Sequence, residues 1–420
     1  MSKRARDNRP YIKPVTRIEL SGEHTTLRLI LLIVLLVIAA VAIMIGLSSA
    51  LEVEPGWQEV EVHSDKVNCS TEFMLMYDFS EYGVNESTNA LKKLNALYST
   101  LTEDAYAIFT ASNYETDIAN VRYLNDHINE SVTVNPALYE ALELTVQYGS
   151  RYPFLAPVYE EYDRIFLQSS EEDAMRYDPA KSPELLEYVH QAASFANDSS
   201  MIWLELLGNN EVCLHVDDAY LAFAKTYELD TFFDFHWMSN AFIIDYMAQE
   251  LTAKGYTNGY IGSYDGFNRN LDTRGKQYSH NVYDFQEGEV FLPAVYNYGV
   301  PTSIVVLKNY PMSEKDRWHY FSYADGSITT TFLDPVGGTS KSATDNLFSY
   351  SRKAGCAEIL LQTAPLFIAD QLDEDGLQKL ADRGIYAIWG EGFELHYNEA
   401  DANIIPVADN GGDLYVMIQE

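Results

Sequence analysis

The spacing of apolar and polar residues predicts interleaved helices and strands in the first part of the folded region. Residues 73–79 (FMLMYDF) have the composition of a strand, and residues 85–108 place a Leu/Ala face opposite a polar face, as an amphipathic helix does. A second amphipathic helix is predicted over residues 135–152, with Asn135 as its N-cap and Pro136 at its first position. Helix and strand signals follow one another without a repeat.

The second part of the chain continues this mixed pattern. Residues 245–256 predict a helix that ends at Gly255, and residues 257–272 predict a short strand that runs into a turn rich in Gly and Asn. Three later segments also have regular patterns: strands at 301–310 and 326–335, and a buried helix at 356–370. Because neighbouring strands are joined like hairpins, we expect an α+β fold with mixed or antiparallel sheets and flanking helices, not a doubly wound sheet.

One segment differs from all others. Residues 29–47 (LILLIVLLVIAAVAIMIGL) contain nineteen residues without a charge or a proline, which is long enough for a helix to cross a bilayer. Residues 1–28 carry seven Lys or Arg against three acidic residues, so the positive-inside rule keeps this tail in the cytoplasm. The sequence predicts a single-pass transmembrane anchor in the cell membrane, with the main domain extracytoplasmic.

Cleavage behind this segment is the alternative, because Ser48 and Ala50 form a small-residue pair of the signal-peptidase type. An apolar run of this length exceeds the usual signal-peptide core, which favours an uncleaved anchor. Residues 48–66 are then expected to be a juxtamembrane linker, and residues 67–420 an extracytoplasmic domain.

Composition restricts the partners of that domain. The chain has 420 residues, 47% of them hydrophobic, and a formal net charge of −34. It can therefore bury a sizeable core. Nucleic acid is an unsuitable partner, because neutralising phosphates requires clustered Lys and Arg, and the 28 such residues are spread along the chain. The acidity fits a solvated surface and names no substrate.

The commonest catalytic signatures are missing from the sequence. Cys69, Cys213 and Cys356 form no CxxC and no zinc spacing, so we expect isolated buried thiols, with one disulfide as the alternative. HExxH, Walker A and GxSxG motifs do not occur. Other patterns must therefore point to the chemistry.

The segment 234–245 (DFHWMSNAFIID) carries such a pattern. Together with the order of the flanking elements, it resembles the ApbE-type FAD:protein FMN transferase family over about residues 67–420. The family motif D-L-G-G-I-A-K-G-Y-A-V-D matches the segment without gaps. Asp234 and Asp245 fall on its first and last Asp, and Phe242 falls on its aromatic residue.

The positions between the two acids differ from the family motif. His236 and Trp237 replace its two glycines, Ser239 its Ala, Asn240 its Lys and Ala241 its final Gly. The glycines let the backbone approach a pyrophosphate, and the Lys supplies a cation for it. A His and a Trp would crowd that loop, and Asn carries no charge. We expect the remnant of a pyrophosphate-binding loop, with Asp234, Asn240 and Asp245 as degenerate catalytic positions.

Three other segments are similar to family motifs. Residues 154–157 (FLAP) resemble F-D-P-T without its Asp and Thr, and residues 331–338 (TFLDPVGG) resemble H-I-I-D-P-x-T-G without its His. Residues 264–266 (YDG) resemble the family's G-G-D/N turn. The resemblance implies FAD as cofactor and assigns five residues to its binding: Asp265, Gly266, Thr331, Asp334 and Pro335.

The resemblance also implies Mg²⁺. The family motif A-D-x-x-x-[ST] lies over residues 357–362, so its two side-chain ligands become Glu358 and Gln362, and its carbonyl ligand corresponds to Ser239. Mg²⁺ requires near-ideal octahedral oxygen geometry at short distances. A longer carboxylate and a neutral amide are a poor exchange, so we expect a weakened metal site.

Several of these residues also have a purely structural interpretation. Asp234 and Asp245 are suited to cap a helix N-terminus, where unpaired N–H groups favour a carboxylate. His236, His280 and His319 are interpreted as surface or satisfied core histidines, because no ligands at metal spacing accompany them.

Two further acidic segments differ in their interpretation. Residues 373–376 (DEDG) are interpreted as a helix start, because the rest of a calcium loop is missing. Glu358 is harder to dismiss, because a carboxylate in a buried helix needs a partner.

Three hypotheses follow for the function. The first is a non-catalytic extracytoplasmic module that binds a flavin or other small ligand, or a protein partner. The second is an active transferase that uses FAD and Mg²⁺ to attach FMN to a Thr or Ser of an extracytoplasmic target protein. The third is a structural ectodomain that tethers neighbouring membrane proteins.

Overall fold

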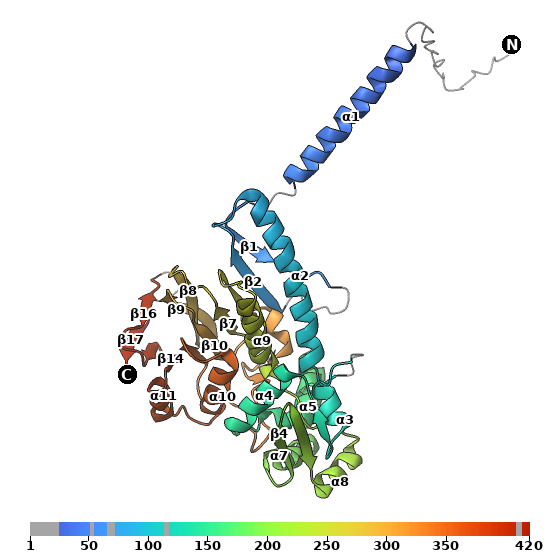
Figure 1. Ribbon diagram of the computed structural model, residues 1–420. Helices are drawn as coiled ribbons and strands as arrows, with labels where there is room; N and C mark the ends of the chain where they lie inside the picture. Colours follow the sequence, from blue (N-terminus) through green and yellow to red (C-terminus); the bar gives the residue numbers. More distant parts are fainter. Residues whose placement is uncertain (1–24, 51–53, 65–71, 113–116, 409–413) are drawn as a thin grey trace, which may run out of the picture. The chain divides into compact units, whose positions relative to one another are not determined.

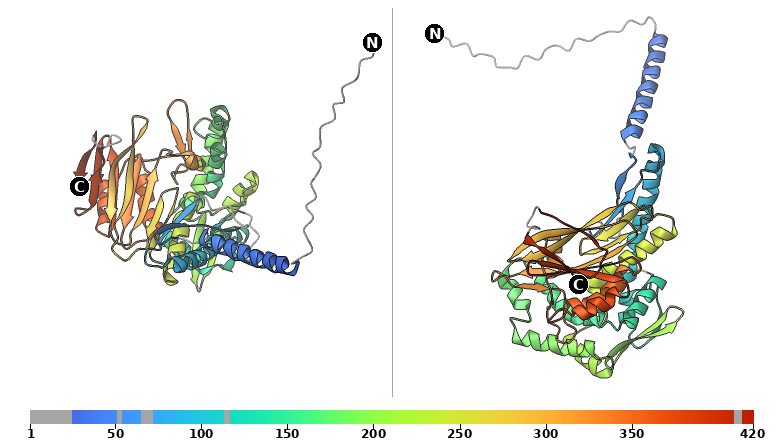
Figure 2. Two further views of the ribbon diagram at one scale, coloured as in Figure 1. Left: turned by 90° about the horizontal axis from the view of Figure 1, so that it is seen from above. Right: turned by 90° about the vertical axis from the view of Figure 1, so that its left-hand side faces the viewer.

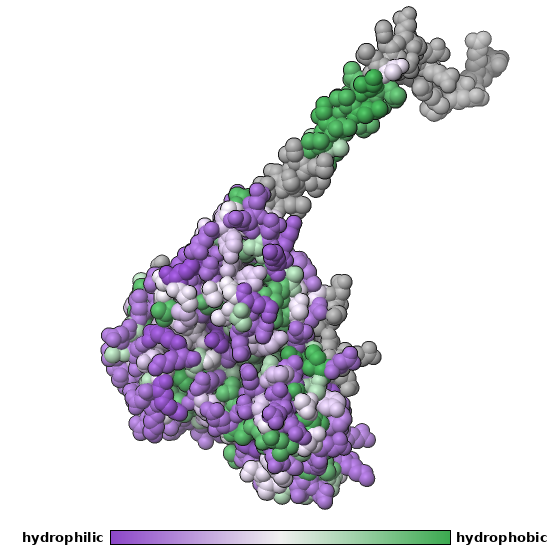
Figure 3. Space-filling model, in the orientation of Figure 1, coloured by the Kyte–Doolittle hydropathy of each residue, from purple (hydrophilic) through white to green (hydrophobic). Residues whose placement is uncertain are grey.

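The computed structural model describes residues 25–50, 54–64, 72–112, 117–408 and 414–420, and the chain divides into two units, residues 1–54 and 55–420. The first unit contains helix α1 (Thr25–Ala50), whose described side chains are hydrophobic along most of its length (Figure 3). Among the described residues, no helix is both long and apolar enough to cross a membrane, so the predicted transmembrane helix is not confirmed.

The second unit, residues 55–420, alternates helices and strands (Figure 1). Its helices are α2 (Val84–Phe109), α3 (Val121–Asp126), α4 (Pro136–Gln147), α5 (Ala156–Phe166), α6 (Glu171–Tyr177), α7 (Pro183–Asn197), α8 (Asp218–Tyr227), α9 (Ser239–Ala253), α10 (Cys356–Phe367) and α11 (Glu374–Ala381), with 3₁₀ turns η1 (Tyr152–Leu155), η2 (His236–Met238) and η3 (Glu314–Trp318). Its strands are β1 (Trp57–Val60), β2 (Phe73–Asp78), β3 (Ser131–Thr133), β4 (Ile202–Gly208), β5 (Glu211–Val216), β6 (Gly259–Ser263), β7 (Phe267–Asn270), β8 (Tyr278–Gln286), β9 (Glu289–Tyr298), β10 (Ser303–Lys308), β11 (Tyr320–Ser322), β12 (Ile328–Thr330), β13 (Asn346–Ser351), β14 (Ile385–Glu391), β15 (Glu394–Tyr397), β16 (Asn403–Pro406) and β17 (Val416–Gln419).

A large sheet forms the centre of this unit. Within the described residues, nine strands lie in the order β1-β2-β6-β7-β10-β13-β14-β15-β17, with antiparallel pairing except between β15 and β17. The yellow-to-red strands of this sheet lie side by side in Figure 2. Smaller sheets have the orders β16-β9-β8, β3-β5-β4 and β11-β12. The predicted α+β class is confirmed, and a doubly wound parallel sheet is excluded.

Alternating side chains of the large sheet enter two separate cores. On β10, Ile304 packs with Phe348 and Tyr350 beneath the β16-β9-β8 sheet, whereas Val305 and Leu307 belong to the core shared with the helices. This alternation follows from the period of two along a strand. Strands β10 and β13 are therefore buried on both faces, with α10 on one side and β8 on the other.

Most elements predicted from the sequence are present, with shifted ends. Asn135 caps α4 through Ala137 N, and Gly255 has φ +82° just behind α9, as expected. Helix α4 ends at Gln147, not at residue 152, because Gly149 takes a left-handed conformation with φ +62°. The predicted strand 326–335 shortens to β12, and residues 57–60 of the expected linker form β1, paired with β2. Helix α9 contacts β6, the strand that follows it in the chain.

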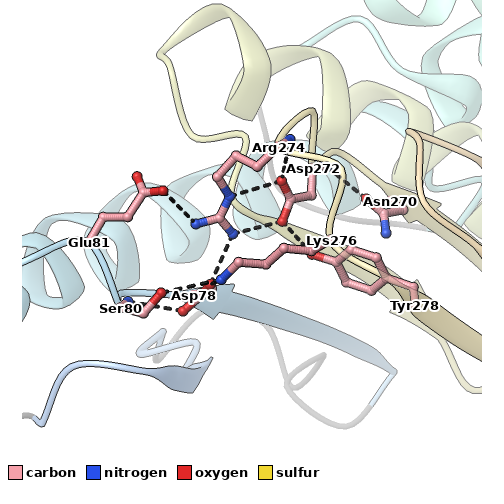
Figure 4. A network of polar contacts seen from close by, with 8 residues as sticks. All are labelled: Asp78, Ser80, Glu81, Asn270, Asp272, Arg274, Lys276 and Tyr278. Atoms are coloured by element: carbon pink, nitrogen blue, oxygen red, sulfur yellow. Dashed lines mark hydrogen bonds and ion pairs between the residues drawn. The ribbon is translucent and has the colours of Figure 1, made fainter.

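A buried ion-pair network fastens the loop behind β7 to the end of β2 (Figure 4). Asp78 and Asp272 are each 1% exposed, and Arg274 binds both carboxylates, at 3.0 Å and 2.7 Å. Lys276 also pairs with Asp78, and the Tyr278 hydroxyl donates to Asp272 at 2.6 Å. Because both buried acids have cationic partners, the network is satisfied without a ligand.

Candidate functional site

A pocket of about 830 Å³ opens beside the segment 234–240 that the sequence singled out. Its walls come from the end of α2, from α5, from η2 and the first turn of α9, from the turn between β6 and β7, and from η3. Asp234, Ser239, Asn240 and Asp265 were predicted as site residues and line this pocket. Most of the loop positions expected from the sequence therefore do meet in one place.

The loop itself has an unusual backbone at His236. Its φ is +48°, in the left-handed region that a side chain with a Cβ disfavours. Oδ1 of Asp234 accepts a hydrogen bond from the backbone N–H of His236 at 2.9 Å and so supports this turn. Position 236 is where the resembled motif has its first glycine. The loop keeps a backbone conformation suited to glycine although the residue has changed.

The side chain of His236 is held on three sides. Its ring stacks on Tyr159 with centroids 4.3 Å apart, and Nε2 lies 3.1 Å from Oδ1 of Asp163. Nδ1 lies 3.3 Å from the hydroxyl of Thr331. Burial opposes the imidazolium, but the hydrogen bond and charge of Asp163, with the charge of Asp234, outweigh it and raise the pKa of His236.

Trp237 fills the space behind the loop. It is 4% exposed, its indole N–H donates to the Tyr159 hydroxyl at 3.1 Å, and its ring meets Phe332 edge-on at 5.0 Å. A side chain of this size occupies the volume that a glycine at the same position would leave open. That these rings crowd a bound pyrophosphate stays a prediction.

Asn240 points toward Asp265 in the β6–β7 turn. Its amide donates to Oδ2 of Asp265 at 2.8 Å, while Oδ1 of Asp265 is buried without a hydrogen-bond partner. Burial raises the pKa of Asp265 to about 6, against the hydrogen bonds from Ser263 and Asn240. Gly266 completes the turn with φ +109°; a Cβ there would meet the carbonyl oxygen of Val306 at 2.4 Å. Gly266 is needed for this backbone approach.

Beside Asp265, the lining residue Asp316 forms a buried ion pair with Lys308, which lies outside the lining. Nζ of Lys308 lies 3.2 Å from Oδ1 of Asp316, and Oδ2 of Asp316 accepts the backbone N–H groups of Met312 and Ser313. Burial, together with the charges of His236 and Lys308, lowers the pKa of His319 to about 4, so this ring is neutral at neutral pH. Nδ1 of His319 is buried without a hydrogen-bond partner.

The lining is acidic and aromatic. Among the described residues of the lining, five carry carboxylates and none is Lys or Arg; the acids are Glu72, Asp163, Asp234, Asp265 and Asp316. Six are aromatic rings other than histidine: Tyr106, Phe109, Phe166, Trp237, Tyr264 and Trp318. A pocket with such walls attracts cations and aromatic surfaces and repels anions.

Other predicted residues lie outside this pocket. Asp245 caps α10, accepting from the backbone N–H groups of Cys356 and Ala357 at 2.9 Å each, and binds Arg269. The helix-capping interpretation is thus correct for Asp245, although the capped helix is α10 and not its own. Thr331 is 1% exposed and contacts two lining residues, His236 through its hydroxyl and the His319 carbonyl through its backbone N–H.

The residues assigned to the metal do not converge. Glu358 is half-buried and accepts a hydrogen bond from the Tyr148 hydroxyl at 2.7 Å, and Gln362 donates to the Glu358 backbone carbonyl. Neither lines the pocket, whereas Ser239 does. Within the described residues, no group of three His, Cys, Asp or Glu side chains is placed to hold a metal ion.

Asp334 and Pro335 belong to a separate turn. Oδ2 of Asp334 lies 3.2 Å from Nζ of Lys341, and its Oδ1 accepts the backbone N–H of Val336. Cys213 and Cys356 are free and buried; Cys69 lies outside the described residues. Asp373 caps α11, as predicted for a helix start.

Comparisons with known proteins place this geometry in a fold. No protein-family model and no curated protein matches the chain. Among solved structures, it is similar to the ApbE protein from Thermotoga maritima, with a TM-score of 0.55 and 13% identity, over 84% of this chain and 97% of that one. It is also similar to a mutant of the flavin transferase ApbE from Vibrio cholerae, with a TM-score of 0.50 and 11% identity, over the same shares of both chains. The chain has the ApbE fold, so the predicted architecture is confirmed.

Several acidic and aromatic residues of the lining were missed by the sequence interpretation. Asp163 on α5 and Asp316 on η3 lie far along the chain from the loop, and Glu72 and Trp318 belong to no motif. The residues next to them in the sequence form no motif that would indicate a role in binding. Tertiary packing alone brings these side chains to the loop.

Proposed function

We propose that this chain is a membrane-anchored, extracytoplasmic binding module that holds a small ligand in the 830 Å³ pocket and transfers no FMN. The observation that carries this proposal is the loop at His236 and Trp237. It keeps the left-handed backbone at the glycine position of the motif, but two ring systems fill the place of the glycines. The frame of a ligand-binding loop is present, and the approach to its backbone is closed.

The charge of the pocket supports the same conclusion. A pyrophosphate carries negative charge and requires a cation or free N–H groups. The described lining offers five carboxylates and Asn240 in place of the motif lysine. Removing a cation from a site that stabilises charge in a transition state costs about a hundredfold or more in rate. These residues do not fit the pyrophosphate of FAD with Mg²⁺.

The location rests on the sequence. Residues 29–47 are uncharged, and the basic tail ahead of them contrasts with the acidic remainder of the chain. Digestion of intact spheroplasts by an added protease tests this part. The large domain should be degraded; its full protection would contradict the extracytoplasmic location.

An active transferase is the second candidate, and one contact favours it. Position 331 has Thr where the resembled motif has His, yet the imidazole of His236 lies against the Thr331 hydroxyl at 3.3 Å. The ring is also paired with Asp163, as a general base often is with an orienting carboxylate. The imidazole of His236 thus lies beside position 331, where the resembled motif has its histidine.

Flavin binding by the full chain separates the two candidates. Riboflavin, FMN and FAD share the isoalloxazine ring and differ in phosphate charge. Their dissociation constants therefore report whether the pocket favours or disfavours negative charge. A binding module with acidic walls should hold riboflavin at least about tenfold more tightly than FAD, with or without Mg²⁺. FAD binding that is the tightest of the three and strengthens with Mg²⁺ would favour the transferase.

A further inference from the structure

We infer that the ligand of this pocket is an organic cation with an aromatic body; this inference rests on the proposed binding function and specifies the chemistry of the ligand. Organic cations of this class include protonated aromatic amines and quaternary ammonium compounds. The argument has three parts: the balance of charge in the walls, an unused buried acceptor, and the exposed rings.

The carboxylates of the lining fall into two groups. Asp163 is paired with His236, and Asp316 is paired with Lys308, so their charges are compensated within the protein. Asp265 has no cationic residue within salt-bridge distance, and its polar side-chain neighbours Asn240 and Ser263 are uncharged. Negative charge therefore exceeds positive charge on the wall formed by the β6–β7 turn.

Two acids beside that wall add to the excess. Glu72 precedes β2 and raises the pKa of Asp265 through its charge, so the two carboxylates repel each other. Burial raises the pKa of Asp234 against the charge of His236, a cation that Asp234 shares with Asp163. Like charges held together in a half-buried wall are stabilised by a bound cation.

Asp265 also offers a specific contact. Its Oδ1 is buried and accepts no hydrogen bond, although Oδ2 is fixed by Asn240. A buried carboxylate oxygen without a donor is costly, and a cation bound against this wall would stabilise the charge of Asp265. The nearest buried lysine, Lys308, is directed to Asp316 and lies outside the pocket lining.

The rings around the opening fit the body of such a ligand. Trp318 is 48% exposed and Tyr264 is 45% exposed, although both line the pocket. The Trp318 ring already holds the guanidinium of Arg317 at 4.4 Å from its centroid, which shows that this ring accepts a cation on its face. Large exposed rings beside excess carboxylates are the usual surroundings of an organic cation.

Three probes with one aromatic body test the inference on the full chain. Tryptamine carries a cation, tryptophol is neutral and indole-3-acetate is an anion, so binding measured by calorimetry at neutral pH varies charge alone. We expect tryptamine to bind about tenfold or more tightly than tryptophol, and indole-3-acetate to bind most weakly. Added salt should weaken tryptamine binding and leave tryptophol unchanged.

Two matched substitutions locate the effect. Asp265→Asn keeps the hydrogen bond from Asn240 but removes the charge, and should remove most of the preference for tryptamine over tryptophol. Asp382→Asn makes the same chemical change at an exposed acid outside the pocket lining and should leave the preference intact.

The outcomes separate the inference from the proposed function. Equal binding of tryptamine and tryptophol, or tightest binding of indole-3-acetate, would overturn the cation inference and leave a binding module of other specificity. A preference for tryptamine that survives in Asp265→Asn would overturn the assigned contact. If none of these probes and no flavin binds, the proposed function fails together with the inference.

Discussion

The side-chain amide of Asn240 donates a hydrogen bond to Oδ2 of Asp265 across 2.8 Å. The resembled motif has a lysine at position 240, and a lysine there would form an ion pair with Asp265. With a neutral amide in its place, Asp265 keeps its charge uncompensated and its Oδ1 without a donor. Asn240 in place of the motif lysine thus leaves the wall around Asp265 without a cation, and we expect this wall to attract one.

Restoring the cation should close the pocket to cationic ligands. In Asn240→Lys, the ammonium group pairs with Asp265 and lowers the pKa of that carboxyl below its present value of about 6. The affinity for tryptamine, measured by calorimetry, should fall about tenfold or more. Asn240→Gln keeps an uncharged amide and serves as the control. Unchanged tryptamine binding in Asn240→Lys would show that Asp265 is not the recognition group.

Asp265 should make the folded state less stable at neutral pH. Its pKa is raised to about 6 from 3.8, so the folded state holds this proton more tightly than the unfolded state does. The free energy of unfolding should therefore rise as the pH falls from 7 toward 4, by on the order of 2 kcal/mol from this group. The groups facing it, Asn240, Ser263, Glu72 and Lys308, set this value.

Urea unfolding of the wild type and Asp265→Asn at pH 7 and pH 5 isolates that contribution. His236 also has a raised pKa and favours the fold at lower pH, but both proteins contain it. The variant should be the more stable protein at pH 7, and the gap should narrow at pH 5. A variant less stable than wild type at pH 7 would contradict the assigned burial cost.

Two tryptophans of the same pocket should behave in opposite ways. Trp237→Ala removes a side chain that is 4% exposed and should lower the free energy of unfolding by about 3–5 kcal/mol. Trp318→Ala removes a ring that is 48% exposed and should change stability by about 0.5 kcal/mol or less, while weakening tryptamine binding several-fold. Urea unfolding and calorimetry together check both. A strongly destabilised Trp318→Ala would show that this ring serves the fold and not the ligand.

The ion-pair network of Figure 4 should make the fold sensitive to acid. Burial alone would raise the pKa of Asp272, but hydrogen bonds from Arg274 and Tyr278 outweigh it and lower the pKa to about 2. The stability from this group is present above about pH 4 and is lost as the pH falls toward 2. Arg274→Met leaves the buried carboxylate of Asp272 without its cation, while Asp78 keeps Lys276, and should cost roughly 3–5 kcal/mol at pH 7.

Arg176→Met is the matched control for Arg274→Met. Arg176 makes exposed pairs with Glu172 and Asp173, which contribute about 1 kcal/mol or less. Urea midpoints at pH 7 compare the two variants. Equal losses in both would mean that the buried network stabilises the fold no more than a surface pair does.

Local signals predicted the elements that depend on local chemistry. Asn135 with Pro136 gave the start of α4, and Gly255 gave the end of α9, because caps are decided by neighbouring residues. The β8–β9 hairpin was missed: its alternation is weakened where Val282, Ala294 and Tyr296 face a second core. The positions of β8 in phase with Val282 also include the polar residues His280 and Asp284, so hydrophobic alternation does not identify this strand.

Some residues of the candidate site could be located from the sequence, whereas others are brought to the site only by tertiary packing. The motif frame located Asp234, Asn240 and Asp265, because a resemblance carries positions along the chain. It also pointed to Glu358, whose half-buried carboxylate instead accepts a hydrogen bond from Tyr148. Asp163 carried no signal, because its role exists only where α5 packs against the loop at His236.

Covalent flavin transfer is the measurement that tests the central claim most directly. The full chain is incubated with FAD, Mg²⁺ and an acceptor protein with a flavinylation sequence, and flavin fluorescence is read on a denaturing gel. A proven transferase run in parallel shows that the acceptor is competent. The binding-module account predicts no fluorescent acceptor band with this chain. A band that appears with the wild type and disappears in His236→Asn would contradict the account and establish the chain as an active transferase.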